Sequence, residues 1–287
     1  MKGIDIMNIN WYPGHMKKTK DLLKENLKLV DIVIELLDAR IPLSSKNPDI
    51  DGIVNNKPKL IIMNKSDLSD EKTNLEFKKH FEDKGNKVLF INSLNRRSAD
   101  IIVKEINRIL ADKIEKKKEK GIKHSVIRAM IVGIPNVGKS TLINTLSGRK
   151  GAKTGNRPGV TKGKQWIKLK GNIELLDTPG ILWGKFEDQD IALNLAFTGA
   201  IKDEILDIET LGLRLIERIR DIDENILINR YGIDIDESDT GLDIMDKIAI
   251  KRGFIIKNKE IDYMRTANIL LDEFRKGILG KISLEKI

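Results

Sequence analysis

The segment Gly133-Ile134-Pro135-Asn136-Val137-Gly138-Lys139-Ser140 decides the fold of this 287-residue chain. It has the spacing G-x-x-x-x-G-K-[ST], follows an apolar segment that predicts a strand (126–132) and precedes the helical segment 141–146. Glycines in such a loop let backbone N–H groups converge on phosphate oxygens, and the helix N-terminus adds positive potential. We therefore expect a nucleotide site. The loop residues that we expect to contact the nucleotide are Asn136, Val137, Gly138, Lys139, Ser140 and Thr141. Lys139 should reach the β and γ phosphates, and Ser140 should offer its hydroxyl to Mg²⁺.

Downstream of this loop, Leu176-Asp177-Thr178-Pro179-Gly180 ends a predicted strand. An aspartate at this place can help to hold the coordination shell of a bound Mg²⁺, and Gly180 lets the backbone approach the γ-phosphate. The polar loop 157–163 lies between the two motifs, and its Thr161 can coordinate Mg²⁺ when the γ-phosphate is present. We predict Ser140, Thr161 and Asp177 as the magnesium ligands.

Upstream of the loop, Asn64-Lys65-Ser66-Asp67 directly follows an apolar strand segment. The Asp67 carboxylate can accept two hydrogen bonds from guanine, whereas adenine would leave that carboxylate unpaired. Lys65 can lie along the base, and Asn64 can connect this loop to the phosphate loop. Asn92 and Ser93, after the next strand segment, form a second candidate loop for the base. Taken together with the phosphate loop, these residues predict a site for guanine nucleotides.

The arrangement of apolar segments predicts a doubly wound α/β domain with a mostly parallel sheet. Strands are expected at 32–37, 59–63, 88–91 and 126–132, and two shorter ones form a hairpin around Lys170-Gly171-Asn172. Amphipathic helices are expected at 17–29, 70–84 and 98–120. The charged end of the last helix, 115–121, is either a basic binding element or a solvated helix end, and we favour the second interpretation.

The segment that follows residue 187 predicts a separate, all-helical domain, 188–287, beside a nucleotide-binding domain, 1–187. Its helices are expected at 191–201, 208–219, 242–251 and 261–276, with Phe197, Phe254 and Phe274 in the core. Net charge divides at the same place, because residues 1–187 carry +15 and residues 188–287 carry −6. The basic part is expected to attract phosphate backbones, which favours contact with nucleic acid.

Composition excludes several other classes of protein. The chain has no cysteine and only three histidines, which excludes disulfide frameworks, thiolate metal sites and cysteine nucleophiles and makes a histidine-rich metal centre improbable. No apolar run approaches the roughly 20 residues that span a bilayer, and the N-terminus lacks the apolar block of a signal peptide. We therefore expect a cytoplasmic protein with no membrane partner.

The order of the motifs is permuted, because the base-reading loops precede the phosphate loop. All of these loops follow parallel strands, so the same site can form from a rearranged chain. In this order the sequence resembles the circularly permuted GTPases, and among them the ribosome biogenesis GTPase A family. The resemblance covers essentially the whole chain and rests also on Trp11-Tyr12-Pro13-Gly14-His15-Met16, on Asp38-Ala39-Arg40-Ile41-Pro42 and on the acidic helical tail. Tyr12 departs from the Phe that is common there.

The resemblance implies how hydrolysis is catalysed. Many GTPases have a water-orienting glutamine directly after the D-x-x-G glycine, but this chain has Ile181 there. The resemblance implies His15 as the residue that positions water, with Lys139 and Thr161 as the other catalytic residues; the alternative for His15 is an RNA contact or a helix cap. Asn136 stands where related GTPases help to bind K⁺, or it caps its own loop. Without a partner, turnover should be slow.

Two functional hypotheses follow from the resemblance and the charge. The first is a GTP hydrolase that assists assembly of the large (50S) ribosomal subunit, contacts rRNA and ribosomal proteins, is stimulated by the subunit and then released; away from it the protein is expected to be a monomer. The second is an RNA-binding module that senses guanine nucleotides without ribosome-stimulated turnover. An ATP-dependent kinase is disfavoured by Asp67.

Overall fold

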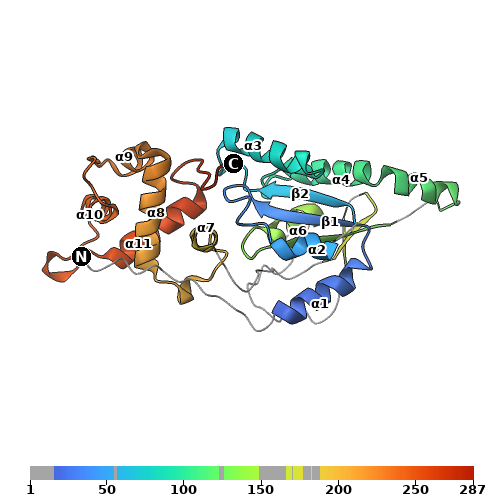
Figure 1. The fold of residues 1–287 in the computed structure, drawn as a ribbon, viewed down its shortest axis with the longest axis horizontal. Helices are drawn as coiled ribbons and strands as arrows, with labels where there is room; N and C mark the ends of the chain where they lie inside the picture. The colour runs from blue at the N-terminus through green and yellow to red at the C-terminus, as the bar shows by residue number, and fades with distance from the viewer. Residues whose placement is uncertain are drawn as a thin grey trace. The chain divides into compact units, whose positions relative to one another are not determined.

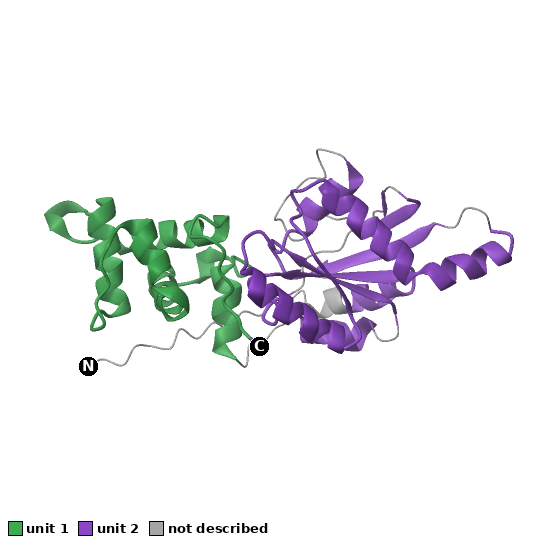
Figure 2. Cartoon of the chain, turned by 90° about the horizontal axis from the view of Figure 1, so that it is seen from above, with its two compact units in different colours: residues 1–11, 186–286 green, residues 12–185, 287 purple. Residues whose placement is uncertain are grey.

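The computed structural model describes residues 16–54, 57–122, 126–148, 166–169, 171–176, 182 and 188–287. The chain divides into two compact units (Figure 2). One contains a sheet with its helices, and the other contains the helices from residue 189 onward. The boundary expected at 187/188 stays a prediction, because the residues just before it lie outside the described set.

The first unit is built on a six-stranded sheet with the strand order β3-β2-β1-β4-β6-β5 (Figure 1). All neighbouring strands are parallel except β5 and β6, which form an antiparallel hairpin. The strands are β1 Ile32–Asp38, β2 Lys59–Asn64, β3 Lys87–Phe90, β4 Ile127–Gly133, β5 Trp166–Lys168 and β6 Ile173–Leu176. The predicted α/β fold with a mostly parallel sheet is therefore confirmed.

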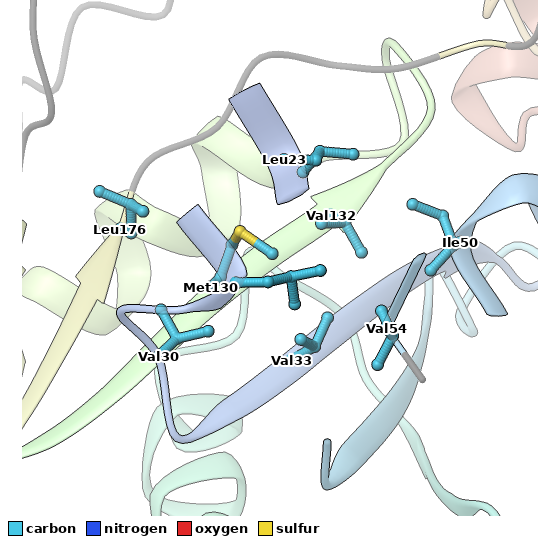
Figure 3. Close-up of a cluster of buried hydrophobic side chains, with 9 residues drawn as sticks. Leu23, Val30, Val33, Ile50, Val54, Met130, Val132 and Leu176 are labelled. Atoms are coloured by element: carbon cyan, nitrogen blue, oxygen red, sulfur yellow. The ribbon is translucent and has the colours of Figure 1, made fainter. Parts of the chain in front are cut away.

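Helices cover both faces of the sheet. Their bounds are α1 Met16–Leu27, α2 Pro48–Val54, α3 Glu71–Asp83, α4 Arg97–Ile109, α5 Ala111–Glu119 and α6 Lys139–Ser147. Every residue of β1 is buried, as expected for a central strand with both faces covered. Side chains of α1 and α2 pack against Val33, Met130 and Leu176 (Figure 3), and Phe77 and Phe81 of α3 extend the same layer. Right-handed crossovers place α4 and α6, which contact each other, on the opposite face.

The expected helix 98–120 is divided into α4 and α5 at Leu110, where the backbone leaves helical geometry (φ −100°, ψ 13°). The reason lies in the apolar stripe of this segment. Ile102, Ile106 and Leu110 are buried, whereas α5 buries no residue at all. The stripe that holds α4 on the sheet therefore ends at Leu110, and α5 continues as a solvated helix beyond it (Figure 1).

The second unit is helical, as predicted. It contains α7 Gln189–Phe197, α8 Ile208–Asp223, α9 Asn225–Tyr231, α10 Gly241–Arg252 and α11 Tyr263–Lys276, with short 3-10 turns at Asp203–Ile205 and Lys257–Lys259. Helix α8 contacts the other four, and its Gly212 lies so close to α11 that a Cβ there would be 2.5 Å from the Ala267 Cβ. Phe197, Phe254 and Phe274 are buried, as expected. Across the described ranges, no helix combines the length and apolarity needed to cross a bilayer.

Candidate functional site

Five parallel strands end at one edge of the sheet, and the described part of the candidate site is built from the loops that follow β1, β2, β3 and β4. The register aligns Asp38 of β1 with Asn64 of β2, and Leu36 of β1 with Gly133 of β4. The carboxyl ends of β1, β2 and β4 therefore lie side by side. Ligands of open α/β sheets bind at this edge, where the order of the strands reverses.

The phosphate loop connects β4 to α6 and is held in an open turn by two residues with positive φ, Asn136 (56°) and Gly138 (102°). A Cβ on Gly138 would be 2.3 Å from Asn64 Nδ2, so both the space and the backbone require glycine. Lys139 is buried (8% exposed), and its ammonium donates hydrogen bonds to the carbonyl oxygens of Gly133 (3.0 Å) and Ile134 (2.6 Å). The loop thus folds around its own lysine, and α6 begins at its end.

Asn64 connects the base loop to two others. Its Nδ2 donates a hydrogen bond to the Val137 carbonyl oxygen (2.7 Å), and its Oδ1 accepts from the Ser93 backbone N–H (3.0 Å) and hydroxyl (2.6 Å). The side chain is 2% exposed, and buried amide groups cost free energy unless they are bonded in this way. The Thr145 hydroxyl of α6 in turn donates to the Ser93 carbonyl oxygen (2.6 Å). Three segments that are distant in sequence therefore form one structure.

A buried charge cluster supports Lys65. Its ammonium donates to Asp38 Oδ2 (2.9 Å) and to the Asn136 carbonyl oxygen (3.0 Å), while its backbone adopts a positive φ of 59°. Asp38 also accepts from Arg40 Nε (2.9 Å) and a terminal guanidinium nitrogen (2.8 Å), and both side chains are 1% exposed. Burial alone would raise the pKa of Asp38, but the charges of Arg40 and Lys65 outweigh it and hold that pKa far below its ordinary value. Asp38 therefore stays ionised.

The base-reading residues lie at the rim of the same edge. The Ser66 N–H donates to the Ile91 carbonyl oxygen (3.2 Å), which places the base loop beside the loop after β3. Asp67 is exposed, and its carboxylate makes no hydrogen bond within the described part of the chain. Asn92 Oδ1 accepts from the Leu94 N–H (2.8 Å) and so shapes its own loop. An exposed carboxylate on a fixed loop is able to accept hydrogen bonds from a base.

Four predicted site residues lie outside the described residues: His15, Thr161, Asp177 and Gly180. Of the predicted magnesium ligands, Ser140 is described, and it is exposed at the start of α6 beside Thr141. Hydroxyl and carboxylate oxygens are the ligands that Mg²⁺ prefers, so the predicted set suits that ion chemically. Within the described ranges, no group of three or more acidic or histidine side chains is able to hold a metal.

Two parts of the arrangement were not predicted as site components. Asp38 holds Lys65 and is itself bonded by Arg40, although in the sequence Asp38 and Arg40 only marked a resemblance, and Thr145 connects α6 to Ser93. A signal for the first existed, because Asp38 ends a strand that neighbours β2 and is followed two residues later by an arginine. The Thr145 contact spans 52 residues and leaves no local pattern.

Comparison with known families identifies the phosphate-loop region. Residues 128–247 match a family model described as "50S ribosome-binding GTPase". The matched region begins in β4 and therefore leaves out the Asn64–Asp67 loop, which precedes it in this chain.

Relatives match nearly the whole chain. The ribosome biogenesis GTPase A of Bacillus licheniformis is 47% identical over 287 residues, covering 98% of this chain and 99% of that protein. The one from Thermotoga maritima is 31% identical over 278 residues, covering 97% and 94%. A solved structure of GDP-bound TM YlqF has a TM-score of 0.67 at 27% identity and covers 92% of this chain and 98% of that one. The GNP-bound T. maritima YlqF has a TM-score of 0.64 at 28% identity, with coverage of 94% and 98%.

Proposed function

The chain belongs to the ribosome biogenesis GTPase A family of circularly permuted GTPases, and we propose that it hydrolyses GTP as an assembly factor for the large ribosomal subunit. In this proposal GTP binding prepares the protein for the subunit, the subunit stimulates hydrolysis, and hydrolysis leads to release. The protein would act in the cytoplasm, as a monomer when it is away from the subunit.

The observation that carries the proposal is the Asn64 amide, which joins the base loop to the phosphate loop and to Ser93. It joins the two loops that we assign to base recognition and phosphate binding, although their order in the chain is permuted. In the proposed complex the Asp67 carboxylate accepts from the N1–H and the exocyclic amine of guanine, and Lys65 lies along the ring. Asn92 and Ser93 border the other side of the base.

Triphosphate binding is assigned to the phosphate loop. The backbone N–H groups of residues 136–141 and the positive end of α6 would hold the phosphates. The Lys139 ammonium would replace a hydrogen bond to a loop carbonyl oxygen with hydrogen bonds to phosphate oxygens. Ser140, Thr161 and Asp177 would hold Mg²⁺, which neutralises charge on the β and γ phosphates. Phosphoryl transfer requires mainly this positioning and charge neutralisation. Gly180 would lie beside the γ-phosphate.

The catalytic residue of the proposal is His15, which would position the attacking water. We expect His15→Ala to bind GTP almost normally and to lose most of the turnover that the subunit stimulates. The matched control is His80→Ala, which removes a histidine from α3, a helix outside the site. Equal stimulated turnover in the two variants would assign His15 a structural role.

The experiment that tests the function is GTP turnover of the full chain with and without purified large subunits. We expect slow turnover alone and a rise of at least about tenfold with subunits, because the partner completes the catalytic arrangement. Undiminished GTP binding with no rise would reject the assembly-factor proposal. It would favour the second candidate, a guanine-nucleotide sensor that binds RNA, for which the basic charge of residues 1–187 is the supporting observation.

A monovalent cation is a further part of the proposal. K⁺ beside Asn136 would stabilise negative charge that develops during hydrolysis. Asn136→Gly keeps the positive backbone φ of 56° accessible while it removes the side-chain ligand. We expect faster turnover in K⁺ than in Na⁺ for the unmodified chain and no difference between the two salts for the variant. Equal rates in both salts for the unmodified chain would exclude a K⁺ role.

A further inference from the structure

An open groove lies at the edge of the sheet opposite the nucleotide loops. It encloses about 500 Å³ and is lined by residues of α1, the end of α2, the start of α5 and the segments that precede β1 and β2. Asp31 directly precedes β1 and Pro58 directly precedes β2, so the groove marks where these strands begin. Its lining consists of Lys24, Leu27, Lys28, Asp31, Ile53, Val54, Lys57, Pro58 and Lys113. We refer to these nine residues as the lysine groove.

The lysine groove has one acidic residue, Asp31, which is already paired. Its carboxylate accepts from the Arg128 backbone N–H (2.9 Å) and from the Lys113 ammonium (2.6 Å). Burial raises the pKa of Asp31, but these hydrogen bonds and the nearby lysine charges outweigh burial and keep the pKa below its ordinary value. Asp31 therefore remains ionised at neutral pH and compensates one lysine charge, which leaves three others.

Those three charges have no acidic partner among the residues that the structure describes. Lys24 and Lys28 are exposed and lie four residues apart, on the same face of the C-terminal part of α1 and directly after it. The Lys57 ammonium donates to the Val30 carbonyl oxygen (2.6 Å), a neutral group that leaves its positive charge uncompensated. The lysine groove thus presents a net positive charge of three around a mainly apolar floor.

Helix α5 extends this charge beyond the groove. Lys113, Lys116, Lys117 and Lys120 follow the spacing i, i+3, i+4, i+7, which puts them on one side of the helical segment over about 10 Å. Lys118, which pairs with Glu115, points to another side. Because α5 buries no residue, its own packing does not account for a segregated lysine side.

We propose that the lysine groove and the lysine side of α5 bind the phosphodiester backbone of RNA. A row of cations over apolar surface suits a chain of phosphates joined by sugars, and lysine neutralises phosphate as a point charge without reading sequence. The inference rests on the proposed function, which supplies RNA as the partner, and names the surface that contacts it. It puts RNA and the guanine nucleotide at opposite edges of the same sheet.

The test measures binding of the full chain to a short RNA duplex over a series of salt concentrations. The variant is Lys24→Gln with Lys28→Gln, two exposed residues outside the nucleotide site. We expect the affinity for the duplex to fall about tenfold near 0.1 M salt and the salt slope to decrease by about two, because each lost phosphate contact removes about one. Lys117→Gln on α5 should show about half of this change in slope.

The matched control is Lys72→Gln with Lys79→Gln, which removes the same charge from exposed positions on α3, outside the lysine groove. GDP binding and thermal unfolding establish that all variants are folded. Unchanged affinity and slope in the Lys24/Lys28 variant, or an equal loss in the control, would overturn the proposal. A loss of binding to polyglutamate with no loss for RNA would assign the groove to an acidic protein instead, and would also overturn it.

The outcome is separable from that of the proposed function. If large subunits stimulate turnover while the Lys24/Lys28 variant binds RNA normally, the function stands and the lysine groove is rejected. If subunits fail to stimulate turnover while the variant loses RNA binding, the groove stands and the assembly function is rejected.

Discussion

The two ends of β1 show two different uses of an aspartate. Asp38, the last residue of the strand, is 1% exposed and is bonded to Arg40 and Lys65, whereas Asp31, just before the strand, is 18% exposed and pairs with the half-exposed Lys113. At the carboxyl end both cations bond the same buried carboxylate, and Lys65 also bonds the Asn136 carbonyl oxygen, so the charged groups connect the base and phosphate loops. At the amino end, among the described lysines only Lys113 bonds the carboxylate, and Lys24, Lys28 and Lys57 line the groove without contacting it. The first edge is therefore rigid before a ligand arrives, and the second retains charge for a partner.

We expect the largest effect for a substitution of Asp38. Asp38→Asn keeps the shape but leaves the buried Arg40 charge uncompensated, so we expect a loss of about 3–5 kcal/mol in the free energy of unfolding at pH 7. The pKa of Asp38 is lowered by folding, so its stabilisation is fully present above the ordinary value of 3.8 and is lost as pH falls below it. Urea unfolding at pH 7 and at pH 3 checks both statements. A gap between variant and parent that stays constant down to pH 3 would contradict the assignment.

Replacement of Gly138 tests whether GTP binding depends on the rigid loops at the carboxyl ends of the strands. Gly138→Ala puts a methyl group 2.3 Å from Asn64 Nδ2 at a φ of 102°, so Asn64 has to leave Val137. We expect GTP affinity to fall by at least about 100-fold, measured by titration, since the loop loses its preorganised shape. Gly148→Ala is the control, because its φ of 64° also lies in the left-handed region, at the other end of α6, with nothing within 4 Å of the added Cβ. Equal affinities in the two variants would refute this explanation.

Replacement of Asp67 tests whether these loops recognise guanine. An amide in place of the carboxylate accepts only one of the two hydrogen bonds from guanine, so Asp67→Asn should lower the preference for GTP over ATP by about tenfold or more. Competition between the two nucleotides measures this preference directly. Unchanged discrimination would remove the base-reading role of Asp67.

Asp31 is where we expect the smallest effect. Asp31→Asn removes a partly solvated ion pair, which should cost less than about 1 kcal/mol of unfolding free energy. The same change frees the Lys113 charge, so the affinity for an RNA duplex should rise about two- to threefold at low salt. A destabilisation as large as that of Asp38→Asn would erase the contrast between the two ends of β1.

Much of the fold follows from local sequence, because the signals of its elements are local. Apolar runs bounded by polar residues identified the strands, and Gly133–Ser140 fixed the strand–loop–helix order around the phosphate loop. The helices α2 and α9, each seven residues long, were missed because so few residues do not establish a helical period. The break at Leu110 was missed because charged residues continue the helical pattern after the apolar stripe ends.

The candidate site was less predictable from the sequence, because its geometry depends on contacts between residues that are distant in the chain. That Asn64 joins the base loop to the phosphate loop was anticipated from the motifs, but its bond to Ser93 spans 29 residues, and Lys65 meets Asp38 across 27. The sequence also shows Lys139 without showing that it binds the Gly133 and Ile134 carbonyls. The predicted roles of His15, Thr161 and Asp177 stay predictions.

The bond between Asn64 and Val137 also constrains how the protein matures. The two residues are 73 positions apart, and a chain made from its N-terminus produces the purine-side loop first. Until β4 and the start of α6 have been translated, the Asn64 amide lacks the Val137 carbonyl oxygen as an acceptor, and the phosphate loop does not exist. The nascent chain therefore passes a long interval of synthesis before the base loop and the phosphate loop are able to join.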